Sequence, residues 1–411
     1  MSVSARSVKF EFRSGARPDP RLITDRASPG THPGGWSFLH DAVTGPLVEF
    51  PAHAARMAYG SGVLIEAAST NHVRNPRGEG ASTGVPPTHW EIDAGSAAAE
   101  IVAHGSADGW PYVDVRLSGA PGGTVQIFFE SASGVAAIPG DSWTFSVSAK
   151  LAGGDLTGVT SVEPIVLSLD SGSVLAEARG GALTLDGQSR RSVMNASVGS
   201  GAATHVRPGL EIASSGAIDL TLRLMAPQME LSSFASSPIF PPTGVVSASD
   251  RSADRISLAL DTRWARGGLT IMADFARMGF HPANGRQNFW SLDDGTFANI
   301  LNVFSHSSGA CRARLQAGGA NDSLIGVQWA DVDDRAERRR VLVALSDGEI
   351  RFRSGAQSDV RTGVDLSVLD AVTHLRLGCD PAGRALNGYL EALSLIPERL
   401  TEEQLAALAA G

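Results

Sequence analysis

Residues 228–254 read QMELSSFASSPIFPPTGVVSASDRSAD and separate two segments of similar character. Ser and Pro are frequent in this stretch and large apolar side chains are few, which is typical of a surface connection. Short runs of alternating apolar and polar residues recur on both sides of it. The stretch therefore predicts a linker at 236–254 between two β-rich domains.

The upstream segment has strand signals at short intervals. Alternation with a period of two buries one face of a strand and wets the other, as an antiparallel sandwich requires. Turn sequences such as SGAPGG at 118–123 supply residues that tolerate positive φ. The predicted strands cover 112–117, 125–130, 143–150, 165–169 and 218–225.

The downstream segment repeats this pattern and adds a helix. Its density of strand signals predicts two stacked sheets, a jelly roll. The tail TEEQLAALAAG predicts a short helix, with Thr401 as the N-cap and acidic residues in the first turn. The predicted strands cover 256–260, 269–275, 288–292, 299–304, 311–316, 341–345, 349–354, 374–379 and 389–396.

Residues 1–60 are rich in Pro and Gly, which exclude a regular helix or a central strand. Such an arm is stable only when it lies on its own domain or on a partner, and the alternative is a disordered terminus. The predicted fold class is therefore all-β: two antiparallel jelly-roll β-sandwiches in tandem, at 61–235 and 255–411, with an irregular N-terminal attachment arm and a short C-terminal helix.

Composition excludes several classes of function. The net charge of −9 argues against nucleic-acid binding and against an anionic membrane. Lys9 and Lys150, the two lysines of the chain, lack the Gly-Lys-Ser/Thr context of a phosphate-binding loop. The start of the chain lacks the apolar run of a signal peptide, and no run has the roughly 18 apolar residues of a membrane helix. We expect a protein made in the cytoplasm of its producer, without membrane insertion.

Patterns typical of enzymes and of metal sites are incomplete. Glu91 and Asp93 begin a glucanase pattern, but Ser96 stands where its last Glu is required. The nucleophile-elbow match GASTG at 80–84 is followed by Val-Pro-Pro, which forbids the helix that an elbow needs. We therefore expect no enzyme and no cofactor. A weak calcium candidate is the acidic run of Asp331, Asp333 and Asp334, with a salt-bridged solvated loop as the alternative.

The two cysteines, Cys311 and Cys379, both lie in the downstream domain. Free core thiols are favoured over a disulfide or a redox pair.

Sugar binding needs flat aromatic faces beside polar groups that hold hydroxyls. The stretch RQNFWSLDDG at 286–295 places candidates at even-numbered positions of one strand and its turn, where they are expected to share a face. The alternative for each aromatic residue is core packing. The candidates are Arg286, Asn288, Trp290, Asp294 and Trp329 in the downstream domain, and Trp110 and Tyr112 in the upstream domain.

Three blocks resemble, in order, sequences of bacteriophage and prophage tail-fibre and head-fibre proteins. They are GVLIEAASTN at 62–71, GDSWTFSVSAK at 140–150 and APQMELSSFASSPI at 226–239. The first block departs from the family in having Ala67-Ala68-Ser69 where Pro-x-Arg is common. The resemblance implies a jelly roll similar to carbohydrate-binding modules.

Further downstream, SDGEIRFRSG at 346–355 and LNGYLEALSLIPERLTEEQL at 386–405 resemble the end of a concanavalin A-like or laminin-G lectin domain. The whole layout is similar to head-spike proteins of gene transfer agents and related phages.

The resemblance implies a virion or gene-transfer-agent spike or fibre subunit that binds a host capsular polysaccharide and promotes attachment. Its implied partners are that polysaccharide, a capsid or spike-base protein bound through the N-terminal arm, and further copies of the chain, with a trimer as the default. Release would be extracellular, as part of a virion-like particle. The alternatives are a polysaccharide depolymerase or glycan hydrolase, and a capsid decoration protein without a ligand.

Overall fold

The structure is a computed structural model that describes residues 8–12, 20–33, 46–58, 62–199, 201–260, 268–278, 285–306, 308–329 and 338–410. The sheets are antiparallel, and the helices in the described ranges are α1 (Val368–Ala371) and α2 (Glu402–Ala410). The prediction of antiparallel sandwiches with a short C-terminal helix is confirmed. None of the described helices has the length and apolar character needed to cross a membrane.

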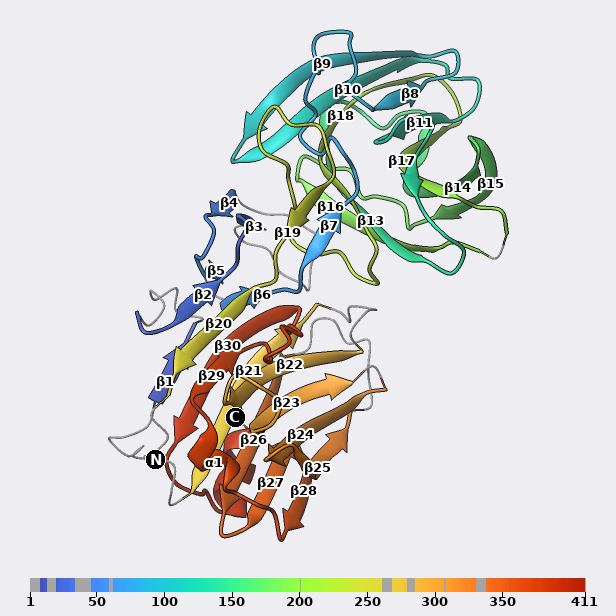
Figure 1. Ribbon diagram of the computed structural model, residues 1–411. Helices are drawn as coiled ribbons and strands as arrows, with labels where there is room; N and C mark the ends of the chain where they lie inside the picture. Colours follow the sequence, from blue (N-terminus) through green and yellow to red (C-terminus); the bar gives the residue numbers. More distant parts are fainter. Residues whose placement is uncertain are drawn as a thin grey trace. The chain divides into compact units, whose positions relative to one another are not determined.

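The chain forms two compact units, each made of separate segments (Figure 1). Unit 1 comprises Met1–Pro29, Phe50–Ala68 and Ser252–Gly411, and unit 2 comprises Gly30–Glu49 and Ser69–Arg251. These units differ from the contiguous ranges that the sequence predicts, because residues from the predicted arm and from the first family block belong to unit 1.

Within the described residues, unit 1 is a sandwich of two sheets. The eight-stranded sheet has the order β28 (Gln357–Thr362), β27 (Glu349–Ser354), β26 (Arg338–Ser346), β21 (Leu269–Arg277), β30 (Gly388–Ile396), β6 (Gly62–Ile65) and β5 (Arg56–Ala58), with β1 (Val8–Glu11) also paired to β30. The seven-stranded sheet has the order β2 (Ile23–Asp25), β20 (Arg255–Ala259), β29 (His374–Leu377), β22 (Arg286–Asp293), β23 (Ile300–His306), β24 (Ala310–Ala317) and β25 (Ala320–Gln328).

The inner faces of these two sheets enclose one apolar core, and β24 shows how the sequence produces it. Cys311, Ala313 and Leu315 are buried in the core, whereas Arg312 is exposed and Arg314 is half-buried. Alternate residues of a strand point to opposite faces of its sheet. The polar residues of β24 therefore point to the outer face of the seven-stranded sheet.

The described residues of the N-terminal arm up to Pro29 lie on unit 1, where they form two short strands. β1 pairs with β30, and β2 pairs with β20. Phe10 and Phe12 are buried in the core of unit 1, while Lys9 and Glu11 are exposed. This alternation lets β1 pack on the sandwich of unit 1. The Pro-rich and Gly-rich composition of residues 1–60 hides it from a reading of the sequence.

The described residues of unit 2 also form two main sheets. One has the order β16 (Arg190–Ser197), β13 (Ser142–Gly154), β18 (Ile218–Glu230), β10 (Trp110–Gly119) and β9 (Ala98–Ala107). The other has the order β15 (Ser173–Arg179), β14 (Val159–Asp170), β17 (His205–Ser214), β11 (Val125–Phe128) and β8 (Glu91–Asp93), with β12 (Val135–Ala136) paired to β17. Two smaller pairs are β3 (Gly30–Pro33) with β4 (Leu47–Phe50) and β7 (Ser69–Asn71) with β19 (Ser249–Arg251).

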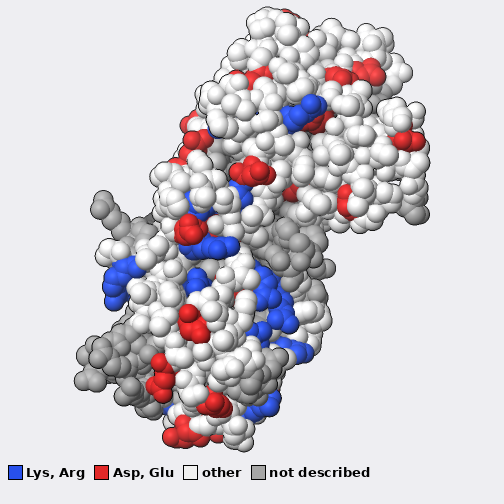
Figure 2. All heavy atoms as spheres, in the orientation of Figure 1, with Lys and Arg blue, Asp and Glu red and all other residues white. Residues whose placement is uncertain are grey.

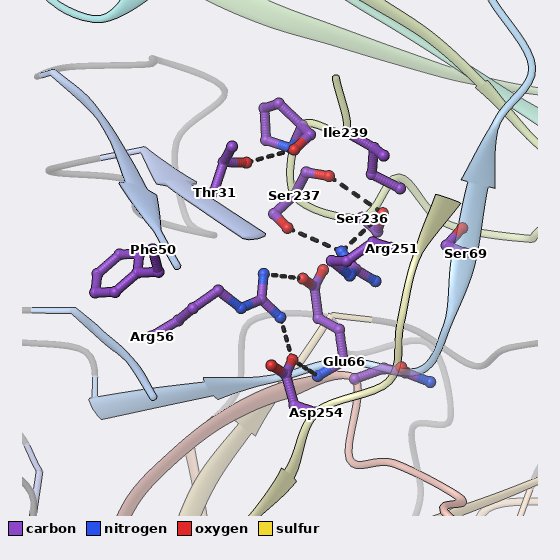
Figure 3. Close-up of polar contacts among 12 residues, drawn as sticks. Thr31, Phe50, Arg56, Glu66, Ser69, Ser236, Ser237, Ile239, Arg251 and Asp254 are labelled. Carbon is purple, nitrogen blue, oxygen red and sulfur yellow. Dashed lines mark hydrogen bonds and ion pairs between the residues drawn. The ribbon is translucent and has the colours of Figure 1, made fainter. Parts of the chain in front are cut away.

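Much of the stretch that predicts a linker is held on unit 2 by buried polar contacts. The Glu230 carboxylate accepts hydrogen bonds from Gln228 Nε2 at 2.7 Å and from the Ser236 backbone N–H at 2.9 Å. Arg251 Nη1 donates to Ser237 Oγ at 2.9 Å (Figure 3). The chain is therefore ordered up to Arg251 by polar side chains, which a search for apolar runs does not detect.

Unit 1 contains a buried ion cluster, formed by Arg26, Arg56, Glu66 and Asp254, and all four residues are at most 1% exposed. Asp254 accepts from Arg26 Nη1 at 2.8 Å and pairs with Arg56. Arg56 Nη1 also donates to Glu66 Oε2 at 2.6 Å (Figure 3). Burial opposes the charge of Arg56, but Asp254 and Glu66 offset this and raise the pKa of its guanidinium. The cluster joins segments from all three parts of unit 1.

Both cysteines are free and buried, which confirms the prediction of core thiols. Burial raises the pKa of the Cys379 thiol to about 12 and raises that of Cys311 well above its usual value.

Because the thiolate is the reactive form, neither thiol of the native protein is expected to react with a disulfide reagent such as DTNB at pH 8. Both are expected to react in urea, as measured by absorbance. Fast labelling of the native chain would contradict this burial.

Candidate functional site

Strand β22 carries three of the predicted sugar-binding residues, and a β-bulge divides them between its two faces. Asn288 pairs with Phe304 of β23, but Trp290 pairs with the next residue, Val303, which leaves Phe289 as an extra residue. One extra residue reverses the alternation beyond it. Trp290 is 0% exposed and lies in the core of unit 1. The shared face that we expected for Trp290 and Asn288 does not form, and Trp290 is a core residue.

Trp329 is also a core residue. It is buried and stacks on Phe289, with ring centroids 5.9 Å apart. Its Nε1 donates to Ser354 Oγ at 3.2 Å. No face of this indole is open to stack on a sugar ring.

The two candidates in unit 2 lie at the start of β10. Trp110 is buried against Leu47 and Met225. Tyr112 is half-buried, and the Arg223 guanidinium lies 3.7 Å from its ring centroid. Asp114 fixes that guanidinium with two hydrogen bonds of 2.8 Å. One face of Tyr112 is therefore covered by a side chain of the same unit.

Asp294 stabilises the turn between β22 and β23. Its carboxylate accepts hydrogen bonds from the Thr296 backbone N–H at 2.9 Å and from Asn299 Nδ2 at 2.7 Å. Burial raises the pKa of this carboxyl, but the hydrogen bonds outweigh burial and lower it overall. These contacts give Asp294 a structural role.

The calcium candidates Asp331, Asp333 and Asp334 lie outside the described residues. Within the described ranges, no three His, Cys, Asp or Glu side chains form a group that could hold a metal ion.

The outer face of the seven-stranded sheet brings together residues that the sequence leaves scattered. Asn302 of β23 lies directly beside Arg314 of β24, and Phe304 lies beside Arg312. The guanidinium of Arg286 lies 4.9 Å from the Phe304 ring centroid. We call this surface the arginine face, and its residues are Arg286, Phe297, Asn302, Phe304, Arg312, Arg314 and Arg384.

Aromatic rings support the guanidinium groups of this face. Arg314 and Arg384 lie 5.3 and 5.1 Å from the ring centroid of Phe297, in the loop between β22 and β23. Stacking on an aromatic ring restricts the plane of a guanidinium and leaves its edge free to donate. These ring contacts therefore restrict the side chains of Arg286, Arg314 and Arg384.

The arginine face carries an excess of positive charge. Arg384 Nε pairs with Asp380 at 2.6 Å, whereas no carboxylate among the described residues pairs with Arg286, Arg312 or Arg314. The pKa of Arg286 is lowered mainly by burial and, to a smaller extent, by the positive charge of the nearby Arg384. The pKa of Arg314 is likewise lowered mainly by burial and then by the positive charge of Arg286. Figure 2 shows blue side chains gathered over the region where β22, β23 and β24 lie in Figure 1.

Several polar atoms of the face lack a partner among the described residues. Arg314 Nε and Nη2 are buried without an acceptor, and Asn302 Oδ1 is buried without a donor. Asn302 Nδ2 donates to Asn288 Oδ1 at 2.7 Å, and Asn288 Nδ2 donates to Asp380 at 3.0 Å. Leaving a buried donor or acceptor unpaired costs about 1–3 kcal/mol. The face thus has unused donors beside an unused acceptor.

The sequence predicted Arg286 of this face and its neighbour Asn288, but none of the other residues of the face. Arg312 and Arg314 were detectable, because the alternation in CRARLQ places both on the side opposite the apolar residues. Phe297 and Arg384 come from loops, and no periodic signal marks their approach.

No protein-family model matches the chain, and no curated protein sequence matches it. Among solved structures, the Ruminococcus gnavus IT-sialidase CBM40 aligns at 16% identity and a TM-score of 0.30, over 36% of this chain and 86% of that one. The NanB sialidase from Streptococcus pneumoniae aligns at 15% and 0.28, over 34% and 23%. The SAP-like pentraxin from Limulus polyphemus aligns at 13% and 0.27, over 35% and 70%. Likeness at this level carries no argument about function.

Proposed function

We propose that this protein is a non-enzymatic adhesin that binds a cell-surface polysaccharide through the arginine face, as a spike or fibre subunit of a virion or gene-transfer particle. The arginine face is the observation that carries this proposal. Planar guanidinium groups donate hydrogen bonds in pairs, and aromatic rings pack against the CH faces of sugars. On the outer side of this sheet Arg312 is exposed and Arg286, Phe297, Arg314 and Arg384 are half-buried, whereas Phe304 is buried beneath them.

The carboxylates near this face support binding without hydrolysis. Asp293 accepts from Arg376 Nε at 2.9 Å and from Ser291 Oγ at 2.8 Å. Asp380 accepts from Arg384 Nε and Asn288 Nδ2. Glycoside hydrolysis needs one carboxyl group that carries a proton to the leaving oxygen. Asp293 and Asp380 each already accept from a guanidinium group, so their contacts suit the positioning of neighbouring side chains.

The particle context rests on the three sequence blocks that resemble fibre proteins. Repeated copies on one particle would multiply weak sugar contacts into firm attachment, because each later contact forms at a high effective concentration. Attachment to a capsid or spike-base protein through the N-terminal arm, and a trimeric assembly, are parts of the same proposal. So is release of the protein with the particle.

Purified protein is expected to remain on capsulated cells of the producing species, to wash off capsule-free cells and to leave the length of the polysaccharide unchanged. Retention is measured in a pull-down, and length by gel filtration of the polysaccharide. Replacing the exposed Arg312 with glutamine is expected to weaken retention about tenfold or more, since a hydrogen bond to a charged group contributes about 1.5–3 kcal/mol.

Arg116→Gln is the matched control for this experiment. It removes an equal charge from an exposed ion pair with Asp219 in unit 2 and is expected to leave retention unchanged. Equal retention on both kinds of cell would reject polysaccharide binding. Shortened polysaccharide would instead identify a hydrolase.

A further inference from the structure

We infer that the arginine face recognises an acidic polysaccharide, with a sugar carboxylate held among Arg286, Arg314 and Arg384 and a neighbouring hydroxyl donating to Asn302 Oδ1. The inference rests on the proposed function and adds the chemical class of the ligand. Three independent features of the face support it: its uncompensated charge, its oriented donors and its unused acceptor.

The charge of the face calls for an anion. Arg286, Arg312, Arg314 and Arg384 contribute four positive charges, and Asp380 contributes one negative charge, which leaves three positive charges in excess. Like charges near one another disfavour each other's ionised forms, and Arg384 acts on Arg286 in this direction. A bound carboxylate would lower this repulsion, whereas a neutral sugar would leave it in place.

The donors are already oriented for such a group. Asp380 accepts from Arg384 Nε at 2.6 Å, from the Arg384 backbone N–H at 3.0 Å and from the Ala382 backbone N–H at 3.1 Å. Among the described residues, nothing accepts from the terminal nitrogens of Arg384. Arg314 Nε and Nη2 are buried and also lack an acceptor among the described residues. A carboxylate has two oxygens that fit such guanidinium edges in pairs.

The acceptor indicates a sugar rather than a simple anion. Asn302 Oδ1 needs a donor, and an ionised carboxylate or sulfate group has none to offer at neutral pH. Asn302 lies directly beside Arg314 across the β23–β24 pair, so the acceptor and the cationic donors are neighbours. A ring that carries both a carboxylate and a hydroxyl satisfies both kinds of group at once.

The test compares two forms of one polymer. Capsular polysaccharide extracted from the producing cells is used as it is and after carbodiimide–borohydride reduction, which converts its carboxyl groups to alcohols. By calorimetry, the protein is expected to bind the native polymer and to bind the reduced polymer at least tenfold more weakly. Arg314→Gln is expected to weaken binding of the native polymer about tenfold or more, because it removes charge-assisted hydrogen bonds.

Two further variants separate geometry from net charge. Arg314→Lys keeps the charge and loses the planar fork, so its affinity is expected to lie between those of Arg314→Gln and the unaltered protein. Arg116→Gln, in unit 2, removes the same charge far from the face in sequence and is expected to bind normally. Circular dichroism confirms the fold of each variant. If Arg314→Gln does not fold, Arg314→Lys and the two polymers still decide the question.

The outcomes distinguish this inference from the proposed function. Equal binding of native and reduced polymer overturns the acidic-sugar assignment and leaves polysaccharide binding intact. Failure to bind either polymer overturns both. Binding that survives reduction but is displaced by inorganic phosphate identifies a phosphate or sulfate ester as the anion, and it rejects the carboxylate.

Discussion

Replacing Asp254 with alanine is expected to lower the free energy of unfolding of unit 1 by about 3–5 kcal/mol. Asp254 is the carboxylate partner of both Arg26 and Arg56, and its loss would leave buried guanidinium groups with too little negative charge. Arg26 would keep only neutral acceptors, among them the carbonyl oxygens of Ala54 at 3.0 Å and Pro51 at 2.8 Å. Thermal unfolding followed by tryptophan fluorescence measures the effect, expected as a fall in Tm of roughly 10 °C.

The control for this variant is Asp219→Ala, which breaks an exposed pair with Arg116 in unit 2. Exposed pairs contribute about 0–1 kcal/mol, so a small shift is expected. An unfolding midpoint for Asp254→Ala equal to that of Asp219→Ala would show that the buried ion cluster does not hold unit 1 together.

Replacing Trp290 with alanine is expected to cost about 3–5 kcal/mol of stability, because it opens a cavity in the apolar core of unit 1. Trp290→Phe keeps most of the apolar volume, and Trp290 Nε1 has no partner among the described residues to lose. We therefore expect Trp290→Phe to remain folded, with a smaller loss of stability, and to bind polysaccharide as the unaltered protein does. Urea unfolding and cell retention measure the two properties separately.

The Arg312→Gln variant is expected to lose binding and keep its stability, which is the reverse of the result expected for Trp290→Phe. Arg312 is exposed, so glutamine there is expected to reduce retention with little change in stability. A Trp290→Phe protein of normal stability that no longer binds would place the ligand against Trp290 and contradict its assignment to the core.

Local alternation was a reliable guide to the strands. The runs at 269–275 and 311–316 form β21 and β24, with their apolar residues in the core of unit 1. Thr401 caps the predicted C-terminal helix, because its Oγ accepts from the Gln404 backbone N–H at 3.3 Å while Gln404 Oε1 accepts from the Thr401 N–H at 2.8 Å. These features depend on residues close together in sequence.

The site depends on features that short windows of sequence do not contain. The bulge at Phe289 moves Trp290 to the opposite face, and no residue type requires a bulge at that position. Phe297 meets Arg384 from a different loop, so their approach follows from the tertiary fold. The sequence analysis favoured tryptophan as the sugar-binding residue, whereas the structure places arginine and phenylalanine on the outer face of the seven-stranded sheet.

Unit 1 is assembled from three separate segments of the chain, and this has a consequence for its synthesis. All strands of unit 2 have been made once the ribosome passes Arg251, so unit 2 has its full set of strands early. Val8 pairs with Leu395, and β1 has no partner strand until β30 emerges. Contacts between residues so far apart in sequence form slowly. The nascent chain must therefore carry β1, with Phe10 and Phe12, as an unpaired apolar segment during most of its translation.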